Sequence, residues 1–269
     1  MSYAVVGHVE WVQFARVAQV PRAGEIVHST DCWEEAAGGG AVAAVQLARL
    51  AGSALLFCAL GTDELGDRAL ARLRQLGVTV HAARRQAPTR RAWVHLDARH
   101  ERTITTLGER LTPSGEDALP WEELRDMRAV YVTAGDAAAI RAARAAPLLV
   151  ASPRSQPQCP VDALVLSAGD STEEHAAASI ETRLRVETNG AHGGIFSGGG
   201  SWQVAPLQRP PQDTYGCGDS FAAGLTYALG TGIEPRAAVA LAARCGAACL
   251  TGAGPYEAQL RAAQLRAES

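Results

Sequence analysis

DTYGCGDSF, residues 213–221, places two glycines, a cysteine and an aspartate directly before an apolar run. This order predicts a tight turn that opens a helix, whose first backbone N–H groups have no partner inside the helix. Glycine allows close approach of a ligand, and free N–H groups at the positive end of a helix dipole bind anions such as phosphate. Because a carboxylate would repel phosphate, Asp219 indicates a base that deprotonates whatever attacks the phosphate.

Three other interpretations of this turn stay open on these residues alone. GDS could carry a serine nucleophile, which needs a basic partner such as histidine. Esterases of that type have their histidine near the C-terminus, whereas the last of the seven histidines here is His192, upstream of the turn. A dinucleotide fingerprint would need a glycine where Phe221 stands. The third alternative is a glycine-rich helix start of purely structural value.

The bulk composition is that of a globular protein. The chain has 269 residues, 47% of them apolar and 20% charged, with a net charge of −3, so we expect neither a nucleic-acid partner nor a membrane partner. The sequence shows no signal peptide and no apolar stretch of the ~20 residues that a membrane helix needs, which predicts a cytoplasmic protein. The six scattered cysteines predict small buried side chains rather than disulfides or a zinc site. All 25 basic residues are arginine, so a P-loop, which requires lysine, is excluded.

Strand and helix patterns alternate along most of the chain. Such alternation predicts an α/β fold, a three-layer αβα sandwich with a mainly parallel central sheet. A hairpin is predicted over 193–205 around SGGG. The predicted strands are 3–7, 53–60, 129–133, 147–152, 163–167 and 182–188, and the predicted helices are 40–50, 64–77, 138–146, 172–179, 217–229 and 235–250.

Two segments interrupt this alternation. Residues 8–36 show aromatic and β-branched alternation without a helix, and residues 88–106 indicate a hairpin that turns near Ala98 to Glu101. We expect the two segments to pair as a small antiparallel sheet over one edge of a single domain that spans 1–269.

Two further glycine clusters strengthen the phosphate interpretation. AAGGGAVAAVQLARLAG, residues 36–52, opens a helix, and TNGAHGG, residues 188–194, follows a predicted strand. Open α/β sheets bind ligands outside the carboxyl ends of their strands, where these turns would meet.

With these motifs in place, the chain resembles the ribokinase-like (PfkB) carbohydrate kinases over nearly its whole length. DTYGCGD is similar to that family's D-T-x-G-A-G-D signature, with Cys217 in place of alanine. AGGGAVAAVQLARLAG resembles the early signature, PRAGEIVHS the P-x-x-G-E segment, and TNGAHG the nucleotide-contacting T-x-G-x-x-G. The resemblance implies a ribokinase-like fold in which segments 8–36 and 88–106 form a β lid.

The resemblance also implies roles for the matched residues. Asp219 would be the catalytic base of an ATP-dependent kinase, which transfers the γ-phosphate to a hydroxyl of a small sugar or sugar-like substrate. Mg²⁺ would arrive with the nucleotide, and loops near Asp213 and 249–254 would be the place for a monovalent cation, although CLTGAG is altered there. A homodimer through the lid would be usual. The remaining positions are Gly216, Cys217 and Gly218 for the anion hole, Thr188, Gly190 and Gly193 for the nucleotide, and Gly38 and Gly39 for the acceptor.

Several positions depart from the family pattern. Val42 stands where asparagine usually contacts a sugar hydroxyl, and Val12 where a sugar-binding aspartate is usual. Glu10 occupies a frequent asparagine position, so Glu10 and Trp11 are expected to make substitute contacts, or else the substrate has fewer hydroxyls. The magnesium-linked N-x-x-E motif appears as SAGD, residues 167–170. A non-catalytic kinase fold that senses a small molecule therefore remains the alternative function.

Overall fold

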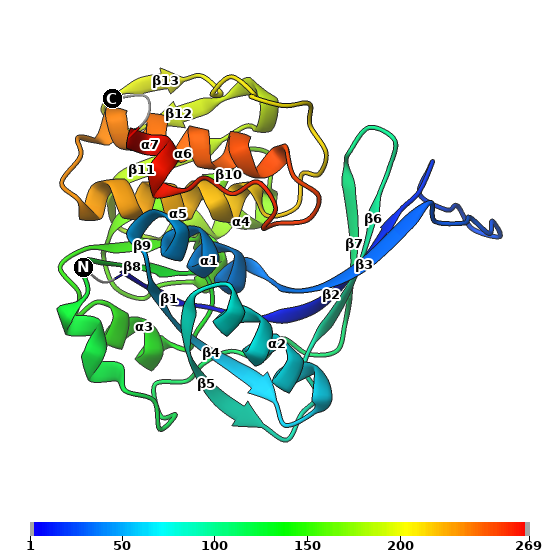
Figure 1. The fold of residues 1–269 in the computed structure, drawn as a ribbon. Coiled ribbons are helices and arrows are strands. Elements are labelled where there is room, and N and C mark those ends of the chain that lie inside the picture. The colour runs from blue at the N-terminus through cyan, green and yellow to red at the C-terminus, as the bar shows by residue number, and fades with distance from the viewer. Residues whose placement is uncertain (1–2, 267–269) are drawn as a thin grey trace.

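The structure, a computed structural model, describes residues 3–266. The predicted domain of 1–269 also includes residues 1–2 and 267–269, which lie outside the described residues. A nine-stranded sheet forms the middle layer, in the order β13-β12-β11-β10-β9-β8-β1-β4-β5 (Figure 1). The run from β11 to β5 is parallel, and β12 and β13 extend it antiparallel. The strands are β1 (Tyr3–Val6), β4 (Ala54–Gly61), β5 (Val78–Arg85), β8 (Ala129–Val132), β9 (Leu149–Ala151), β10 (Val161–Ser167), β11 (Thr182–Thr188), β12 (Gly194–Phe196) and β13 (Gly200–Trp202).

Helices cover both faces of this sheet. Successive residues of β1 point to opposite faces: Tyr3 and Val5 join a core with α1, α5 and α6, whereas Ala4 and Val6 join a second core with α3 and α4. The predicted three-layer sandwich is confirmed. The α-helices are α1 (Gly39–Ala51), α2 (Glu64–Gln75), α3 (Ala137–Ala143), α4 (Ser171–Ala177), α5 (Cys217–Gly230), α6 (Pro235–Leu250) and α7 (Ala262–Arg266), and the 3₁₀ turns are η1 (Trp121–Asp126), η2 (Pro153–Ser155) and η3 (Gly190–His192).

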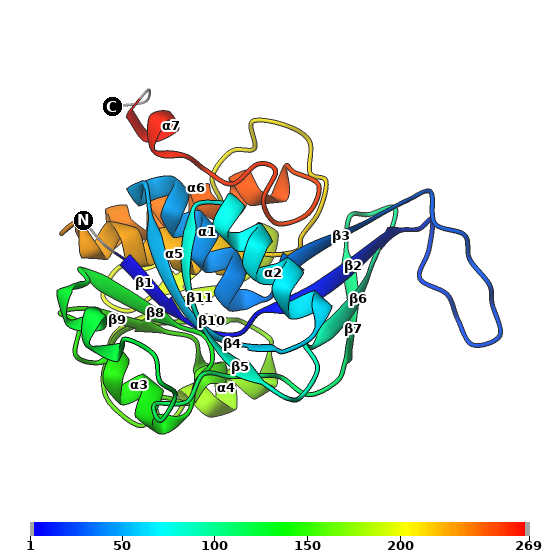
Figure 2. The same ribbon diagram turned by 60° about the horizontal axis from the view of Figure 1, so that its bottom comes forward.

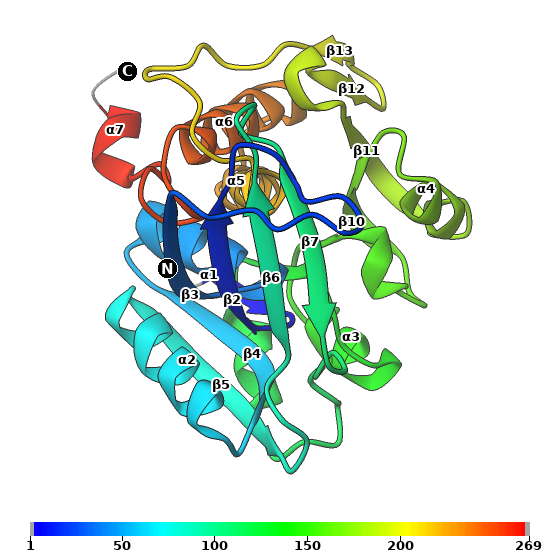
Figure 3. The ribbon, with the colours of Figure 1, turned by 90° about the vertical axis from the view of Figure 1, so that its right-hand side faces the viewer.

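A separate four-stranded sheet, the lid, projects from one end of the main domain (Figures 2 and 3). It is made of β2 (Glu10–Arg16), β3 (Asp31–Ala37), β6 (Arg91–Leu96) and β7 (Arg102–Leu107), in the order β3-β2-β6-β7. Each hairpin is antiparallel, as expected, but β2 and β6 pair in parallel, so the expectation of a purely antiparallel sheet is wrong. The reason is that β2 and β6 continue the parallel strands β1 and β5 and therefore leave the main sheet in the same direction.

One strand of the main sheet is missing from the sequence prediction. β5 lies at the edge of the sheet and alternates apolar residues with Thr79, His81 and Arg84, so its sequence looks like an exposed segment. The predicted helices and the hairpin β12–β13 are confirmed. Within residues 3–266, no helix combines the length and the apolar character needed to cross a membrane.

Candidate active site

Several polar residues lie at the carboxyl edge of the parallel strands. His8 follows β1 and Thr133 follows β8, and their side chains meet at 3.4 Å between Nδ1 and Oγ1. Ser167 and Thr188 end the neighbouring strands β10 and β11 and pair in register. Ligands of open α/β sheets bind at this edge, and α5 begins beside it.

The turn before α5 is shaped by Gly216. This glycine has φ +81°, a left-handed conformation, and a Cβ placed on it would lie 3.0 Å from both Pro255 and Val42. The close approach and the backbone angle both require glycine. The turn therefore has its sharp shape because the residue at its centre has no side chain.

The first backbone amides of α5 are free. No side chain caps this helix, and within residues 3–266 no acceptor is bonded to the N–H groups of Cys217, Gly218 or Asp219. The Cys217 thiol lies 3.8 Å from the carbonyl oxygen of Asp213. Gly218 is exposed, and a Cβ placed on it would meet nothing within 4 Å. This end of α5 is open to an anion.

Two buried side chains hold the turn in place. The Asp213 carboxylate accepts hydrogen bonds from the backbone of Tyr215 at 2.7 Å and of Gly254 at 3.0 Å. The Tyr215 hydroxyl accepts one from the Gly38 N–H at 3.2 Å, which brings the glycine cluster of α1 to the turn. The segments considered for a monovalent cation, near Asp213 and 249–254, are thus joined by Asp213 itself.

Asp219 lies directly against that glycine cluster. A Cβ placed on Gly39 would lie 2.8 Å from Asp219 Oδ1. Burial raises the pKa of Asp219 to about 6; Arg102 opposes the shift, and Glu173 and Glu10 add to it. In the described part of the chain, no ion pair or hydrogen bond engages this carboxylate. An unpaired carboxylate with a pKa near neutrality is suited to accept a proton.

His8 is a site residue that sequence reasoning missed. Its Nε2 accepts a hydrogen bond from the Gly39 N–H at 3.2 Å, so the ring proton is assigned to Nδ1, facing Thr133. Burial lowers the pKa of His8 to about 3, and the positive charges of Arg110 and Arg90 add to the shift, so the imidazole is neutral. It positions Gly39 against Asp219. Its position directly after the first predicted strand, at the edge where open α/β sheets bind ligands, is the sequence feature that could have identified it.

The predicted acceptor residues divide into two groups. Glu10 is buried and pairs with Arg90 at 3.4 Å. Trp11 points to the opposite face of β2, where Arg68 of α2 covers its ring at 4.3 Å, so its expected substrate contact is wrong. Val42 is fully buried beneath the Gly216 turn and offers a ligand no surface, so that assignment is also wrong.

The predicted nucleotide residues lie together beyond β11. The Thr188 hydroxyl donates to the carbonyl of Leu166 at 3.2 Å. Gly190 and Gly193 have φ +50° and +76°, and a Cβ on Gly193 would lie 2.1 Å from the carbonyl oxygen of Trp202. These glycines let η3 turn tightly at the sheet edge.

Carboxylates also stand close to this edge. The Asp170 carboxylate caps α4 by accepting from the backbone N–H groups of Thr172 and Glu173. The side chains of Asp170 and Glu173 each form an ion pair with Arg154. Among residues 3–266, no three His, Cys, Asp or Glu side chains are grouped to hold a metal ion.

The serine alternative is incompatible with the structure. Ser220 is fully buried, and its Oγ accepts a hydrogen bond from Gln259 Nε2 at 3.0 Å. It therefore cannot reach a substrate as a nucleophile.

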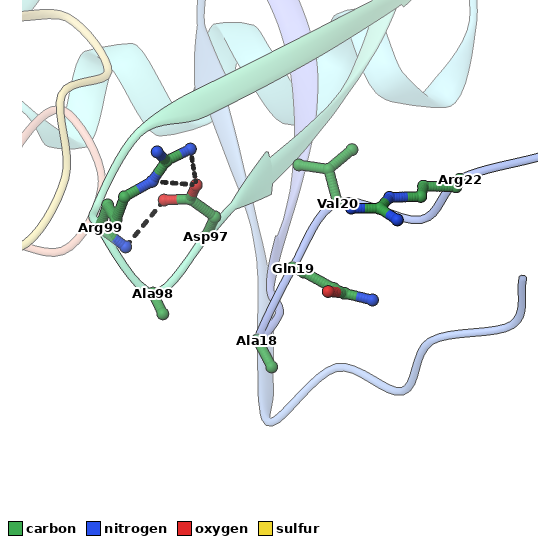
Figure 4. A pocket seen from close by; sticks show the side chains of 7 residues that line it. All are labelled: Ala18, Gln19, Val20, Arg22, Asp97, Ala98 and Arg99. Carbon is green, nitrogen blue, oxygen red and sulfur yellow. Dashed lines mark hydrogen bonds and ion pairs between the residues drawn. The ribbon is translucent and has the colours of Figure 1, made fainter.

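A hollow of about 420 Å³ lies at the outer end of the lid, away from these groups (Figure 4). Asp97 and Arg99, which are bonded to each other, stand on one side of it, and residues 18–20 and Arg22 on the other. It contains none of the predicted site residues.

The β6–β7 turn of the lid contacts the segment that leads into the turn before α5. His100 Nδ1 lies 3.1 Å from the carbonyl oxygen of Gln212. Arg102 donates to the carbonyl of Thr214 at 2.9 Å, and the Thr214 hydroxyl donates to the carbonyl of His100 at 3.3 Å. The lid and the turn are therefore connected directly.

Comparison with known proteins agrees with this arrangement. A ribokinase from Cryptococcus neoformans var. grubii serotype A, in complex with ADP, is 20% identical with a TM-score of 0.78, covering 99% of this chain and 98% of that one. An adenosine kinase from Sinorhizobium meliloti is 17% identical with a TM-score of 0.79, covering 100% and 99%. At such identities the likeness shows a shared fold, here ribokinase-like. No curated protein sequence matches the chain significantly.

A family profile covers almost all of the chain. The profile of the pfkB family of carbohydrate kinases matches residues 2–149 and 161–262. This match includes the turn before α5, both glycine clusters and the lid. The chain therefore belongs to the pfkB carbohydrate kinase family, whose members are phosphotransferases with an alcohol group as acceptor.

Proposed function

We propose that this protein is an ATP-dependent kinase that phosphorylates a hydroxyl of a small sugar-like or nucleoside-like molecule. One observation supports this most strongly: an unpaired, half-buried carboxylate, Asp219, lies beside the free amides of 217–219. The similar ribokinase bound to ADP favours a nucleotide as the phosphoryl donor.

In the proposed reaction, the protein supplies position and charge. The amides of Cys217, Gly218 and Asp219, together with the dipole of α5, bind the transferring phosphoryl group. Asp219 accepts the proton of the acceptor hydroxyl as its oxygen forms a bond to the γ-phosphorus and the bond to ADP breaks. Thr188, Gly190 and Gly193 are proposed to line the nucleotide site, and Gly38 and Gly39 the acceptor site.

Mg²⁺ is proposed to enter with the nucleotide. This ion usually keeps several waters and binds one or two carboxylates together with substrate phosphates. Asp170 and Glu173 are the carboxylates proposed for that limited role, in which they would have to share their oxygens with Arg154 and with the backbone N–H groups that they already accept from. When bound, the ion neutralises charge on the phosphates.

Replacing Asp219 with asparagine tests the proposed function. The shape is kept but the base is lost, so kcat should fall about 10²–10⁴-fold. Asp67→Asn, on the exposed outer side of α2, is the matched control and should behave as wild type. Near-normal turnover by Asp219→Asn would contradict the base role.

The same variant should not be less stable. The folded pKa of Asp219 lies above its usual 3.8, so the ionised side chain costs stability above about pH 6 and costs nothing below about pH 4. At pH 8 the asparagine variant should therefore melt at the same or a higher temperature. A large loss of stability would indicate a structural role instead.

The non-catalytic sensor makes the opposite prediction. It would bind ligand tightly and turn over no ATP with sugars, nucleosides or hydroxymethyl heterocycles. The assay above therefore separates the two functions.

We also propose that two copies associate through the outward face of the lid. Trp93 and Leu107 lie on the face opposite buried Val94, and both are 39% exposed. Exposed apolar side chains on a shared face are typical of an interface, although Ile104, which pairs with Val94 on the other face, is also exposed.

A further inference from the structure

The acceptor side of Asp219 carries an unusual buried ion pair. Arg90, just before β6, places Nη1 3.4 Å from Oε1 of Glu10 on the neighbouring strand β2. The two side chains are only 13% and 7% exposed. Glu10 of this pair stands at a position where the family pattern often has an asparagine.

This pair leaves hydrogen-bonding capacity unused. Charge-assisted bonds are usually about 2.7–2.9 Å long, and Arg72 with Glu35 shows such a pair in this protein, with two bonds of 2.8 Å. Arg90 instead has the single long contact to Glu10, and its buried Nε has no hydrogen-bond partner within residues 3–266. Leaving a buried donor unsatisfied costs stability, so the Arg90 guanidinium would gain a hydrogen bond by turning Nε toward a ligand that accepts from it.

A second guanidinium adds positive charge to the same region. Arg110, an exposed residue shortly after β7, makes no ion pair or hydrogen bond within the described part of the chain. Partial desolvation and the charge of Arg90 lower the pKa of Arg110, and the charge of Glu10 opposes that shift. Burial raises the pKa of Glu10, and the charges of Arg90 and Arg110 oppose this shift in turn. His8 is neutral and adds no charge. Two guanidinium groups that share the Glu10 carboxylate leave a net positive charge, which favours a bound anion.

The cluster is within reach of the reacting hydroxyl. Glu10 lies 3.9 Å from His8, His8 accepts from the Gly39 N–H, and Gly39 lies against Asp219. A small molecule with a hydroxyl at Asp219 can therefore extend to Arg90.

The other arginines near Asp219 are already occupied. Arg154 contacts Asp170 and Glu173, and Arg102 donates to the backbone carbonyl of Thr214. The unused donors on the acceptor side therefore belong to Arg90 and Arg110.

We propose that the acceptor alcohol carries an anionic group, a carboxylate or a phosphate, that Arg90 and Arg110 bind while Asp219 faces its hydroxyl. Guanidinium groups suit both anions because their planar donors match two oxygens at once. Glu10 holds Arg90 in place through Nη1 and leaves Nε for the ligand. This inference rests on the proposed kinase function, since it names the substrate class of the same site.

The experiment compares matched acceptors with full-length protein and ATP. One set of acceptors is ribose, ribonate and ribose 5-phosphate, and the other is glucose, gluconate and glucose 6-phosphate. Turnover of each acceptor is measured as ADP release from ATP. Binding of each acceptor is measured by calorimetry in the presence of a non-hydrolysable ATP analogue. Arg110→Gln, Arg90→Lys and the control Arg99→Gln, a lid arginine paired with Asp97 outside the site, are measured in parallel. Arg90→Lys keeps a positive charge beside Glu10, so it should fold where a neutral residue leaves Glu10 unpaired.

We expect an anionic acceptor to exceed its neutral partner in kcat/KM, with the carboxylate and phosphate members distinguishing the two anions. Arg110→Gln and Arg90→Lys should raise KM for that acceptor about 10- to 100-fold, the effect of losing a bond to a charged group. The KM for ATP should stay unchanged, and Arg99→Gln should match wild type.

Each other outcome is informative. Equal or better use of the neutral members, or an unchanged KM in both arginine variants, overturns the inference and leaves the kinase intact. Calorimetric binding of an anionic member that depends on Arg110, without turnover, supports the anion site and contradicts the kinase. Absence of binding by every anionic member overturns the inference.

Discussion

Asp219 sets the expected pH dependence of the reaction. Its pKa is raised to about 6, chiefly by burial, and the base is active only when ionised. kcat/KM should therefore rise about tenfold per pH unit at low pH and level off above pH 6–7. A rate profile from pH 5 to 9 measures this.

The pH profile of the residual activity of Asp219→Asn is the control, because without the Asp219 carboxylate it should lack the inflection near pH 6. A wild-type profile that is flat down to pH 5 would contradict the assignment of the base.

The glycines of the catalytic turn should respond differently to alanine. Gly218 is helical with open space at its Cβ position, so Gly218→Ala should leave stability unchanged or raise it by up to about 1 kcal/mol. The new methyl group would nevertheless stand where the phosphoryl group binds, and kcat/KM should fall about 100-fold. Thermal melting and steady-state kinetics together measure this.

Gly216→Ala is the matched comparison. Its φ of +81° and two neighbours at 3.0 Å should reduce stability by about 1–2 kcal/mol. If Gly218→Ala kept full activity, the open space there would have no role in phosphate binding.

At the residue scale, the sequence identified the turn but not every side chain around it. The sequence predicts Asp219 as the base and the turn of Gly216, Cys217 and Gly218 as the anion hole because their chemistry is local to one motif, and both roles stay predictions. Trp11 was placed wrongly because alternation along β2 shows two faces without showing which one meets the site. Val42 is buried by Gly216, a contact between distant segments that no local pattern records.

At the scale of elements, Asp213 connects the catalytic turn to the loop after α6. Its two oxygens satisfy the buried N–H groups of Tyr215 and Gly254. Asp213→Ala should lower the free energy of unfolding by about 2–4 kcal/mol, because both donors lose their acceptor. Urea unfolding measures the change.

Asp213→Asn refines this test. The asparagine amide keeps one acceptor oxygen but turns its NH₂ toward the second donor. The free energy of unfolding of Asp213→Asn should therefore lie between the values of Asp213→Ala and wild type. Equal stability of all three proteins would show that these bonds contribute nothing to the fold.

Two features of the elements could not be predicted from sequence. β5 has the polar alternation of an edge strand, which is also typical of exposed segments. The parallel pairing of β2 with β6 depends on the direction in which β1 and β5 leave the main sheet, and this direction is a property of the assembled sheet. Regular, apolar alternation elsewhere made the remaining elements predictable.

At the scale of the whole molecule, the lid should decide the oligomeric state. If Trp93 and Leu107 form the interface, wild-type protein should have twice the mass of one chain in size-exclusion chromatography with light scattering. Trp93→Arg should shift it to a monomer, because a charge would be buried at the contact.

Ile195→Arg is the control, since Ile195 is also exposed, at 53%, but lies on β12 away from the lid. A monomeric wild type, or a Trp93→Arg dimer, would rule out association through this face.

The bonds between the lid's outer turn and residues 212–214 link two events in time. Any opening of the lid would break the contacts of His100 and Arg102 with the backbone beside the turn before α5. If the protein is the proposed kinase, its phosphate site would then be complete only while the lid is closed over an acceptor, and this would limit wasteful hydrolysis of ATP.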